Sequence, residues 1–250
     1  MKMQEETAIA ITYTSMMAIS MYASKNLFGF TYDNPEIVKV LMFTQMAMLV
    51  YAIHSYRKNR KGFDGRKCRI YPGIVIYGIL ILLTAAIHIK EAAYREYGDM
   101  MFQVLLTNAI VGISEELVYR GTIARLMLAR KGRIYAVIGS SLLFSLLHAV
   151  NLLGGLHPSA MTVQLVNTFV YGILASTSMI ASGTMIPFMF FHAIWDAVMS
   201  SPIFVSNHIQ LIAAVMVSEA VIATVQLLLM IESGRCIRKT PPDGISEDAA

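Results

Sequence analysis

The sequence predicts an all-α protein, a polytopic membrane bundle of about eight transmembrane helices. Hydrophobic residues make up 56% of the 250-residue chain and charged residues only 14%, and the mean hydropathy of the whole chain is +0.58. Soluble domains carry about 25% charged residues, so this chain has too few to cover a soluble core of its size. The apolar residues also gather into stretches of about 20, the length at which a helix crosses the hydrocarbon core.

Eight apolar stretches qualify as candidate spans. The first is rich in Thr and Ser, and the seventh is interrupted by Pro187, His192 and Asp196, so these two are the weakest. In chain order, the stretches are 7–24, 36–56, 70–89, 100–128, 134–152, 160–181, 184–203 and 208–232.

Lys and Arg residues predict how these spans are oriented. If the strongly basic loop 57–69 is cytoplasmic, alternation of the spans brings 15 of the 20 Lys and Arg residues to the cytoplasmic side, in agreement with the positive-inside rule. Both termini are then cytoplasmic, residues 1–240 form one transmembrane domain, and residues 241–250 form a disordered tail. The net charge of +4 reflects this topology, so we expect membrane lipid as a partner and no nucleic acid.

Charged groups are costly in the middle of a membrane and mark function by default. We expect them at depth in three spans, the fourth, fifth and seventh, and in none of the other five. In the fourth span, Glu116 and Arg120 stand at i,i+4 in the order that favours an ion pair, and such a pair alone is more often structural. Glu115 is rotated by about 100° from Glu116, which leaves it free to face another helix. Gly112, one turn earlier, would let that helix approach closely.

The fifth and seventh spans each contribute a histidine. Phe144 and His148 stand at i,i+4, and so do His192 and Asp196; the second spacing suits an oriented imidazole or two ligands of one metal. Helical rise puts these groups and Glu115 about 12 to 21 Å from the cytoplasmic ends of their helices, so they can meet in one layer. A lone intramembrane His is usually a hydrogen bonder between helices, but four ionisable groups on three helices favour one shared functional site.

The three motifs, in this order, resemble those of a known family. They read Glu-Glu-x-x-x-Arg at 115–120, Phe-x-x-x-His at 144–148 and His-x-x-x-Asp at 192–196, and they resemble the CPBP family of type II CAAX prenyl endopeptidases and Abi proteins of bacteriocin processing or self-immunity. The resemblance implies an eight-span intramembrane endopeptidase of a prokaryotic cell membrane, with its catalytic core in 100–203 and its site facing the cytosol. The implied substrate is a membrane-associated protein or peptide, either prenylated and CAAX-like or of bacteriocin type.

The resemblance also implies roles for the site residues. Glu115 would be the base that activates water, and His148 and His192 would hold the water, the oxyanion or a metal. Asp196 stands where eukaryotic-type CAAX enzymes often have Asn, and its extra carboxylate could orient a histidine or favour a metal. His148, His192, Glu115 and Asp196 together would make a possible zinc set, so the sequence leaves the zinc-dependent and the metal-free mechanism open.

Peptide hydrolysis itself needs a base for water, a donor for the oxyanion and a proton for the leaving amine. Glutamate and histidine can supply all three, and the chain has no Ser-His-Asp pattern and no His-Glu-x-x-His motif to favour another scheme.

Two other functions stay open at this point. A non-catalytic immunity protein that binds a peptide or partner in the membrane would carry the same motifs. Intramembrane Glu and His also build proton or ion carriers, although the chain lacks the paired broken helices of two related halves that transporters often show.

Overall fold

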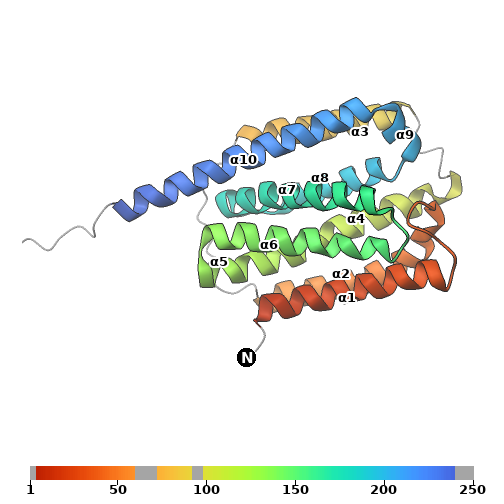
Figure 1. Ribbon diagram of the computed structural model, residues 1–250, viewed down its shortest axis with the longest axis horizontal. Helices are drawn as coiled ribbons and strands as arrows, with labels where there is room; N and C mark the ends of the chain where they lie inside the picture. Colours follow the sequence, from red (N-terminus) through yellow and green to blue (C-terminus); the bar gives the residue numbers. More distant parts are fainter. Residues whose placement is uncertain (1–3, 60–71, 92–97, 240–250) are drawn as a thin grey trace, which may run out of the picture.

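The chain folds into a bundle of roughly aligned helices, with no strand among the residues that the computed structural model describes, which are 4–59, 72–91 and 98–239 (Figure 1). Each of the eight predicted stretches contains a helix among the described residues. The elements are α1 (Glu5–Asn26), η1 (Pro35–Ile37), α2 (Val38–Asn59), α3 (Pro72–Lys90), α4 (Met101–Val118), η3 (Tyr119–Ala124), α5 (Arg125–Lys131), α6 (Arg133–Leu147), η4 (His148–Leu152), α7 (Pro158–Ser182), α8 (Ile186–Met199), α9 (Pro202–Asn207) and α10 (Ile209–Lys239).

Local sequence explains where several of these helices begin and end. The side chain of Asn34 accepts a hydrogen bond from the backbone N–H of Glu36 at the start of η1, and that of Ser201 accepts one from Phe204 at the start of α9. In both cases proline follows the cap, where its missing N–H costs nothing. The C-terminus of α7 is followed by Gly183, whose φ of 78° lies in the left-handed region that glycine tolerates.

Within the described residues, six helical segments are long and apolar enough to cross a membrane. They are Pro35–Asn59, Gly73–Lys90, Gly98–Lys131, Arg133–Leu152, Pro158–Ser182 and Ile209–Ser233. The segments missing from this set are α1 and α8, which correspond to the two stretches that the sequence marks as weakest; α8 has only 14 residues. The polytopic helical membrane class is thus confirmed, while the count of eight spans stays a prediction.

The distribution of side chains is that of a membrane protein. Large apolar side chains are exposed on the outside of the bundle, among them Phe43, Leu82 and Val221, where hydrocarbon would surround them. The largest fully buried side chain among the described residues is that of an arginine, Arg120. Polar groups held inside while apolar groups face out are expected when lipid is the solvent.

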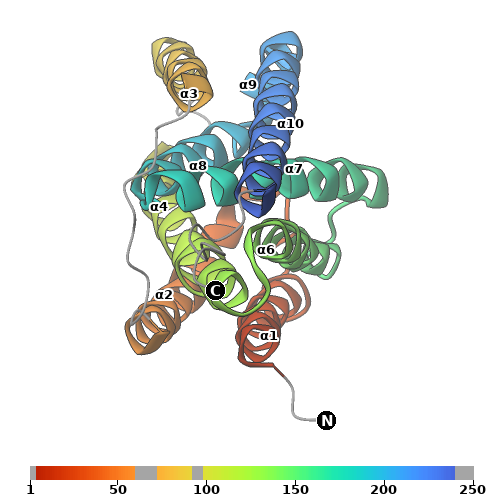
Figure 2. The ribbon, with the colours of Figure 1, turned by 90° about the vertical axis from the view of Figure 1, so that its left-hand side faces the viewer.

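The two ends of the bundle differ in charge. The start of α1, the end of α5 and the last turns of α10 lie together at one end, on the left in Figure 1 and facing the viewer in Figure 2. There Glu5 pairs with Lys58 at 3.2 Å and with Arg130 at 3.6 Å. We call this the basic end, and we call the opposite end, which carries the segments 27–34 and 153–157, the loop end. The tail 241–250 and most of the basic loop lie outside the described residues.

Candidate active site

The last turn of α4 carries the two adjacent acidic residues, and the helix widens directly after it. Residues Tyr119–Ala124 form a π-helical turn, η3, of the kind that occurs often at functional sites. Arg120 lies in this turn, and its Nη1 donates to Glu116 Oε1 at 3.0 Å, with both side chains fully buried. The predicted i,i+4 pair is therefore present. Removing both ions from water is costly, so this buried pair needs further favourable contacts from neighbouring residues.

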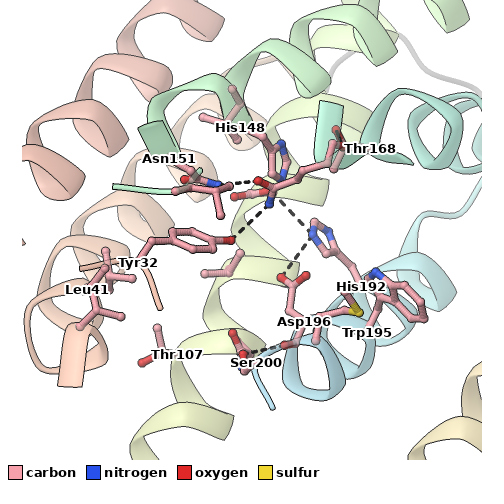
Figure 3. A pocket seen from close by; sticks show the side chains of 18 of the residues that line it. Tyr32, Leu41, Thr107, His148, Asn151, Thr168, His192, Trp195, Asp196 and Ser200 are labelled. Atoms are coloured by element: carbon pink, nitrogen blue, oxygen red, sulfur yellow. Dashed lines mark hydrogen bonds and ion pairs between the residues drawn. The ribbon is translucent and has the colours of Figure 1, made fainter. Parts of the chain in front are cut away.

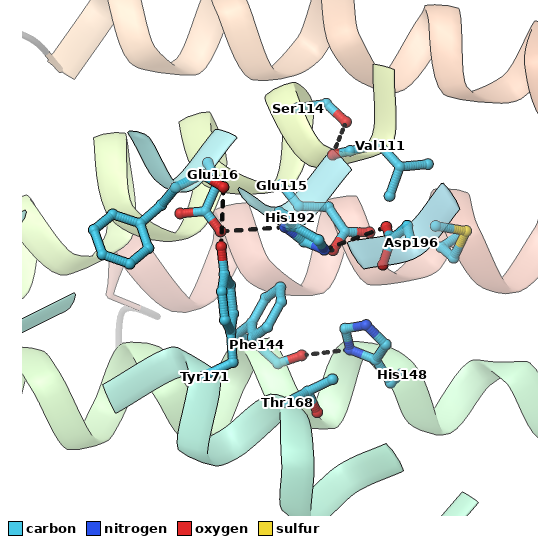
Figure 4. Close-up of polar contacts among 12 residues, drawn as sticks. Val111, Ser114, Glu115, Glu116, Phe144, His148, Thr168, Tyr171, His192 and Asp196 are labelled. Carbon is cyan, nitrogen blue, oxygen red and sulfur yellow. Dashed lines mark hydrogen bonds and ion pairs between the residues drawn. The ribbon is translucent and has the colours of Figure 1, made fainter. Parts of the chain in front are cut away.

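Glu116 and Arg120 also contact other residues of the site. Glu116 Oε1 also accepts a hydrogen bond from His192 Nδ1 at 3.2 Å (Figure 4). The guanidinium of Arg120 lies 4.1 Å from the ring centre of Phe144 and 5.2 Å from that of Tyr171. The ion pair thus positions an imidazole on α8 and an aromatic ring on α6 at the same time.

The second ring nitrogen of His192 faces two further carboxyl groups. His192 Nε2 lies 3.4 Å from Asp196 Oδ2 and 3.8 Å from Glu115 Oε2. The predicted i,i+4 relation of His192 and Asp196 thus brings imidazole and carboxylate together on α8. Three carboxyl groups surround this one buried ring.

His148 stands at the junction where α6 ends and the 3-10 turn η4 begins. Its Nδ1 lies 3.0 Å from the backbone oxygen of Phe144. A carbonyl oxygen only accepts, so Nδ1 carries the proton and Nε2 is left as the acceptor of the neutral ring. The Phe144 ring centre lies 5.0 Å from that of His148 and 5.7 Å from that of His192. Phe144 is therefore the aromatic contact shared by the two histidines.

A close approach of α4 and α8 makes these contacts possible. A Cβ placed on Gly112 would lie 2.7 Å from the backbone nitrogen of Ala193 and 3.0 Å from its Cα. Any side chain at this position would force the helices apart, which confirms the predicted role of Gly112. Ala193 follows His192 directly, so the separation of the two backbones sets the position of the imidazole against α4.

A cavity of about 540 Å³ lies in front of these groups (Figure 3). Four of the six residues that the sequence singles out line this cavity, and the buried pair Glu116–Arg120 does not. The four lining residues are Glu115, His148, His192 and Asp196. The structure therefore divides the two adjacent acids: one faces the cavity, and the other packs behind it.

The cavity lies in the half of the bundle next to the loop end. Each helix that contributes to it does so from that half, such as α7 over 160–171 and α10 at positions 216 and 219. Residues 32–35, at the loop end, line it as well, and Asp33 there is exposed. Toward the basic end, side chains such as Ile123 are fully buried. The site is consequently nearer to the loop end than to the basic end of the bundle.

One charged cavity residue contradicts the sequence prediction that five spans carry none at depth. Glu219 lies on α10, about 15 Å along the helix from Ile209, and its side chain is 1% exposed. It lines the cavity and accepts a hydrogen bond from the hydroxyl of Tyr77 at 2.9 Å. The signal was available, because a single acidic residue in the middle of an apolar span is costly unless it is used.

Several uncharged polar residues at the cavity wall form a chain of hydrogen bonds, and the sequence did not single them out. Asn151 Nδ2 donates to Gln164 Oε1 at 3.1 Å, and Gln164 Nε2 donates to the Tyr32 hydroxyl at 3.2 Å (Figure 3). The backbone N–H of Tyr32 donates to the oxygen of Gly154 at 2.9 Å. These contacts fasten segment 27–34 to α7 at the loop end. Uncharged polar residues near span ends are common, so the sequence alone does not distinguish them.

The sequence leaves a possible zinc set and a metal-free mechanism open. Among the described residues, no three or more His, Cys, Asp and Glu side chains form a group that could hold a metal ion. Both ring nitrogens of His192 are directed at carboxyl oxygens, and His148 Nδ1 is bonded to the backbone.

Comparison with known proteins identifies the segment that carries the site. No curated protein matches the chain, and no solved structure does. Residues 97–198, however, match the family model described as type II CAAX prenyl endopeptidase Rce1-like. This range includes α4 to α8 and all six residues predicted for the site, and it leaves out α1 to α3 and α10. The resemblance inferred from the three motifs is thus confirmed: the part of this membrane protein that holds its candidate site is similar to the Rce1-like CAAX prenyl endopeptidases.

Proposed function

We propose that the protein is an intramembrane endopeptidase that hydrolyses a membrane-associated peptide with water activated by Glu115. The observation that carries this proposal is the division of the two acids. Glu116 is engaged with Arg120 and His192 and does not line the cavity, whereas Glu115 lines it. A general base must lie within reach of water and substrate.

The proposed reaction uses the Glu115 carboxyl group twice. Glu115 takes a proton from water while the water oxygen bonds to the peptide carbonyl carbon, and the carbonyl oxygen becomes the oxyanion. When the C–N bond breaks, the Glu115 carboxyl gives the proton to the departing nitrogen, so the products are a carboxylic acid and an amine. Return of the proton by the same group restores the enzyme for the next cycle.

The histidines divide the remaining tasks. His148 keeps its Nδ1 proton on the backbone oxygen of Phe144, so its Nε2 can accept a hydrogen bond from the attacking water and orient it. His192 is held by Glu116 on one side and faces Glu115 and Asp196 on the other. An N–H at its Nε2 is in position to stabilise the oxyanion that develops beside Glu115. Asp196 orients this ring.

The sequence gives two expectations about which side of the membrane the site faces, and they disagree. The Lys and Arg distribution puts the basic end in the cytosol, and the family resemblance implies a cytosolic site. The cavity lies toward the loop end, so the two expectations exclude each other for this fold. We propose that the charge distribution holds and that the site opens toward the non-cytosolic face.

A binding protein is the second candidate, because a cavity of about 540 Å³ could retain a peptide without cutting it. The test is cleavage of a peptide library and of a prenylated peptide by the purified protein in detergent. We expect Glu115→Gln to lower kcat/KM by about 10²- to 10⁴-fold, the usual contribution of a general base. Glu232→Gln, an exposed position on α10, is the matched control and should keep full activity.

Bound metal is measured on the same samples by mass spectrometry. A stoichiometric metal would assign the mechanism to a metalloprotease. Full cleavage by the Glu115→Gln variant would refute the proposed base. Absence of cleavage by wild type, together with tight peptide binding by both proteins, would establish the binding function instead.

A further inference from the structure

One tyrosine reaches the cavity from a segment that the family match does not include. Tyr32 lies in the segment 27–34 at the loop end, well before residues 97–198. Its half-buried side chain lines the cavity, and in Figure 3 its hydroxyl end is directed toward the side of the cavity that carries His192 and Asp196. A polar group from outside the matched segment is therefore part of the cavity wall.

Contacts at both ends hold the Tyr32 side chain in place. Its backbone N–H donates to the oxygen of Gly154 at 2.9 Å, and the turn that contains it is closed by a hydrogen bond from the N–H of Asn34 to the oxygen of Thr31 at 2.9 Å. At the far end of the ring, the hydroxyl accepts a hydrogen bond from Gln164 Nε2 of α7 at 3.2 Å. A side chain that is fastened at its backbone and at its tip has few orientations left, so its hydroxyl keeps one position against α7.

The direction of the hydrogen bonds leaves one proton available. Asn151 Nδ2 donates to Gln164 Oε1 at 3.1 Å, and Gln164 Nε2 in turn donates to the oxygen of Tyr32. The hydroxyl proton of Tyr32 has no acceptor among the described residues. Successive hydrogen bonds polarise one another, so the last group of such a chain is the stronger donor. Tyr32 is thus the point at which these polar side chains can bind a further molecule.

The Tyr32 hydroxyl stays protonated, as a donor must. Burial raises the pKa of this group to about 12; the hydrogen bond from Gln164 acts against the rise, and the carboxyl groups of Asp196 and Glu115 add to it. The influence of these two carboxyl groups also shows that the hydroxyl lies within electrostatic range of the candidate site.

The other groups of the cavity wall indicate which acceptor this proton would meet. A peptide carries a carbonyl oxygen at every residue, and burying such an oxygen without a donor is costly. Among the described residues that line the cavity, none is Lys or Arg. The donors open to a substrate are consequently amide, hydroxyl, indole and imidazole groups, which suit the uncharged backbone of a peptide.

We propose that Tyr32 is a substrate-binding residue, whose hydroxyl donates a hydrogen bond to a backbone carbonyl oxygen of the peptide in the cavity, and that Gln164 is its positioning residue. No bond is made or broken in this contact, and it does not depend on the side chains of the substrate. It rests on the proposed function for its ligand, the peptide part of a membrane-associated substrate. The segment 27–34 thereby completes a site whose other groups lie in 97–198.

The test measures how tightly the prenylated peptide of the cleavage assay binds to protein that carries Glu115→Gln, so that the peptide stays intact. One backbone carbonyl at a time is replaced by a thiocarbonyl, whose sulfur is a weaker hydrogen-bond acceptor. We expect the replacement at one position to weaken binding by about 2- to 10-fold, the range for a neutral hydrogen bond. Adding Tyr32→Phe should weaken binding of the unmodified peptide by a similar factor and abolish the penalty at that position, because the donor is gone.

A matched control and a separate cleavage assay distinguish the possible results. Tyr22→Phe makes the same change at a tyrosine that is 56% exposed on α1, and it should keep the thiocarbonyl penalty. A penalty that persists in Tyr32→Phe, or no penalty at any position, would overturn the contact; a lower melting temperature of Tyr32→Phe would then assign the residue to fastening segment 27–34. Absence of peptide binding would overturn it too. If the penalty depends on Tyr32 but protein with Glu115 cuts no peptide, the contact stands and the endopeptidase proposal fails.

Discussion

Two neighbouring glutamates have different surroundings because they differ by about 100° around one helix. Glu116 meets Arg120 and His192, while Glu115 faces the cavity. Helical periodicity was sufficient to predict the ion pair and this division. It could not predict that His192 bonds to Glu116, since that contact depends on how α8 packs on α4. Nor did it include Glu219, whose surroundings come from three helices distant in sequence.

At the residue scale, removing Arg120 should be far more damaging than removing a surface cation. Arg120→Ala leaves the fully buried Glu116 carboxyl group without the guanidinium and with His192 as its remaining partner, and breaking a buried pair costs about 3–5 kcal/mol. Lys39→Ala, which breaks an exposed pair with Glu36 at 2.8 Å, should cost less than about 1 kcal/mol. Unfolding in mild detergent measures both values. Equal stability of the two variants would show that Arg120 contributes no more than a surface charge.

At the scale of elements, the decisive features are a glycine and a widened turn. Gly112 was predictable, because small residues mark close helix contacts in membranes. The π-helical turn Tyr119–Ala124 was not, because one extra residue in a turn barely changes the pattern of apolar residues. In the structure, Asn34 and Ser201 cap the starts of η1 and α9, but the apolar stretches alone did not predict either cap. The shortness of α8 was indicated by the polar residues that interrupt its stretch.

Gly112→Ala should reduce activity while the protein still inserts and folds. The added Cβ would meet the backbone of Ala193 at 2.7 Å, so α8 must shift and carry His192 away from its position. A misplacement of about 1 Å can cost about 10²-fold in rate, and we expect a loss of that order in kcat. Gly139→Ala is the matched control, because the closest atom to its Cβ would be at the flexible side-chain end of Met127, at 2.9 Å, and no backbone atom is among its nearest contacts. Comparable activity of both variants would contradict the role assigned to the α4–α8 contact.

At the scale of the whole molecule, the cavity lies in the half of the bundle next to the loop end, whereas Lys58 and Arg130 lie at the basic end. The sequence predicted that both termini share a side, and in the structure the start of α1 and the last turns of α10 do lie at one end (Figure 2). It could not predict on which side the cavity opens. The side on which the cavity opens depends on which half of each helix lines it, and the hydropathy of the sequence does not show this.

Cysteine labelling in intact cells tests the orientation. In a background with Cys68→Ser and Cys236→Ser, a single cysteine replaces either Asp33 at the loop end or Lys131 at the basic end; both positions are exposed. A membrane-impermeant maleimide should label the Asp33→Cys protein in intact cells and the Lys131→Cys protein only after permeabilisation. The reverse pattern would show that the site opens to the cytosol, as the family resemblance implies.

The order of these parts along the chain has a practical consequence. All six predicted site residues fall within 97–198, while Met216 and Glu219 reach the cavity from a helix that comes after this segment. Under the proposed function, the groups that carry out hydrolysis and this part of the cavity wall are encoded in separate stretches. A library randomised at these two positions would therefore vary the wall of the cavity while leaving the six predicted site residues unchanged.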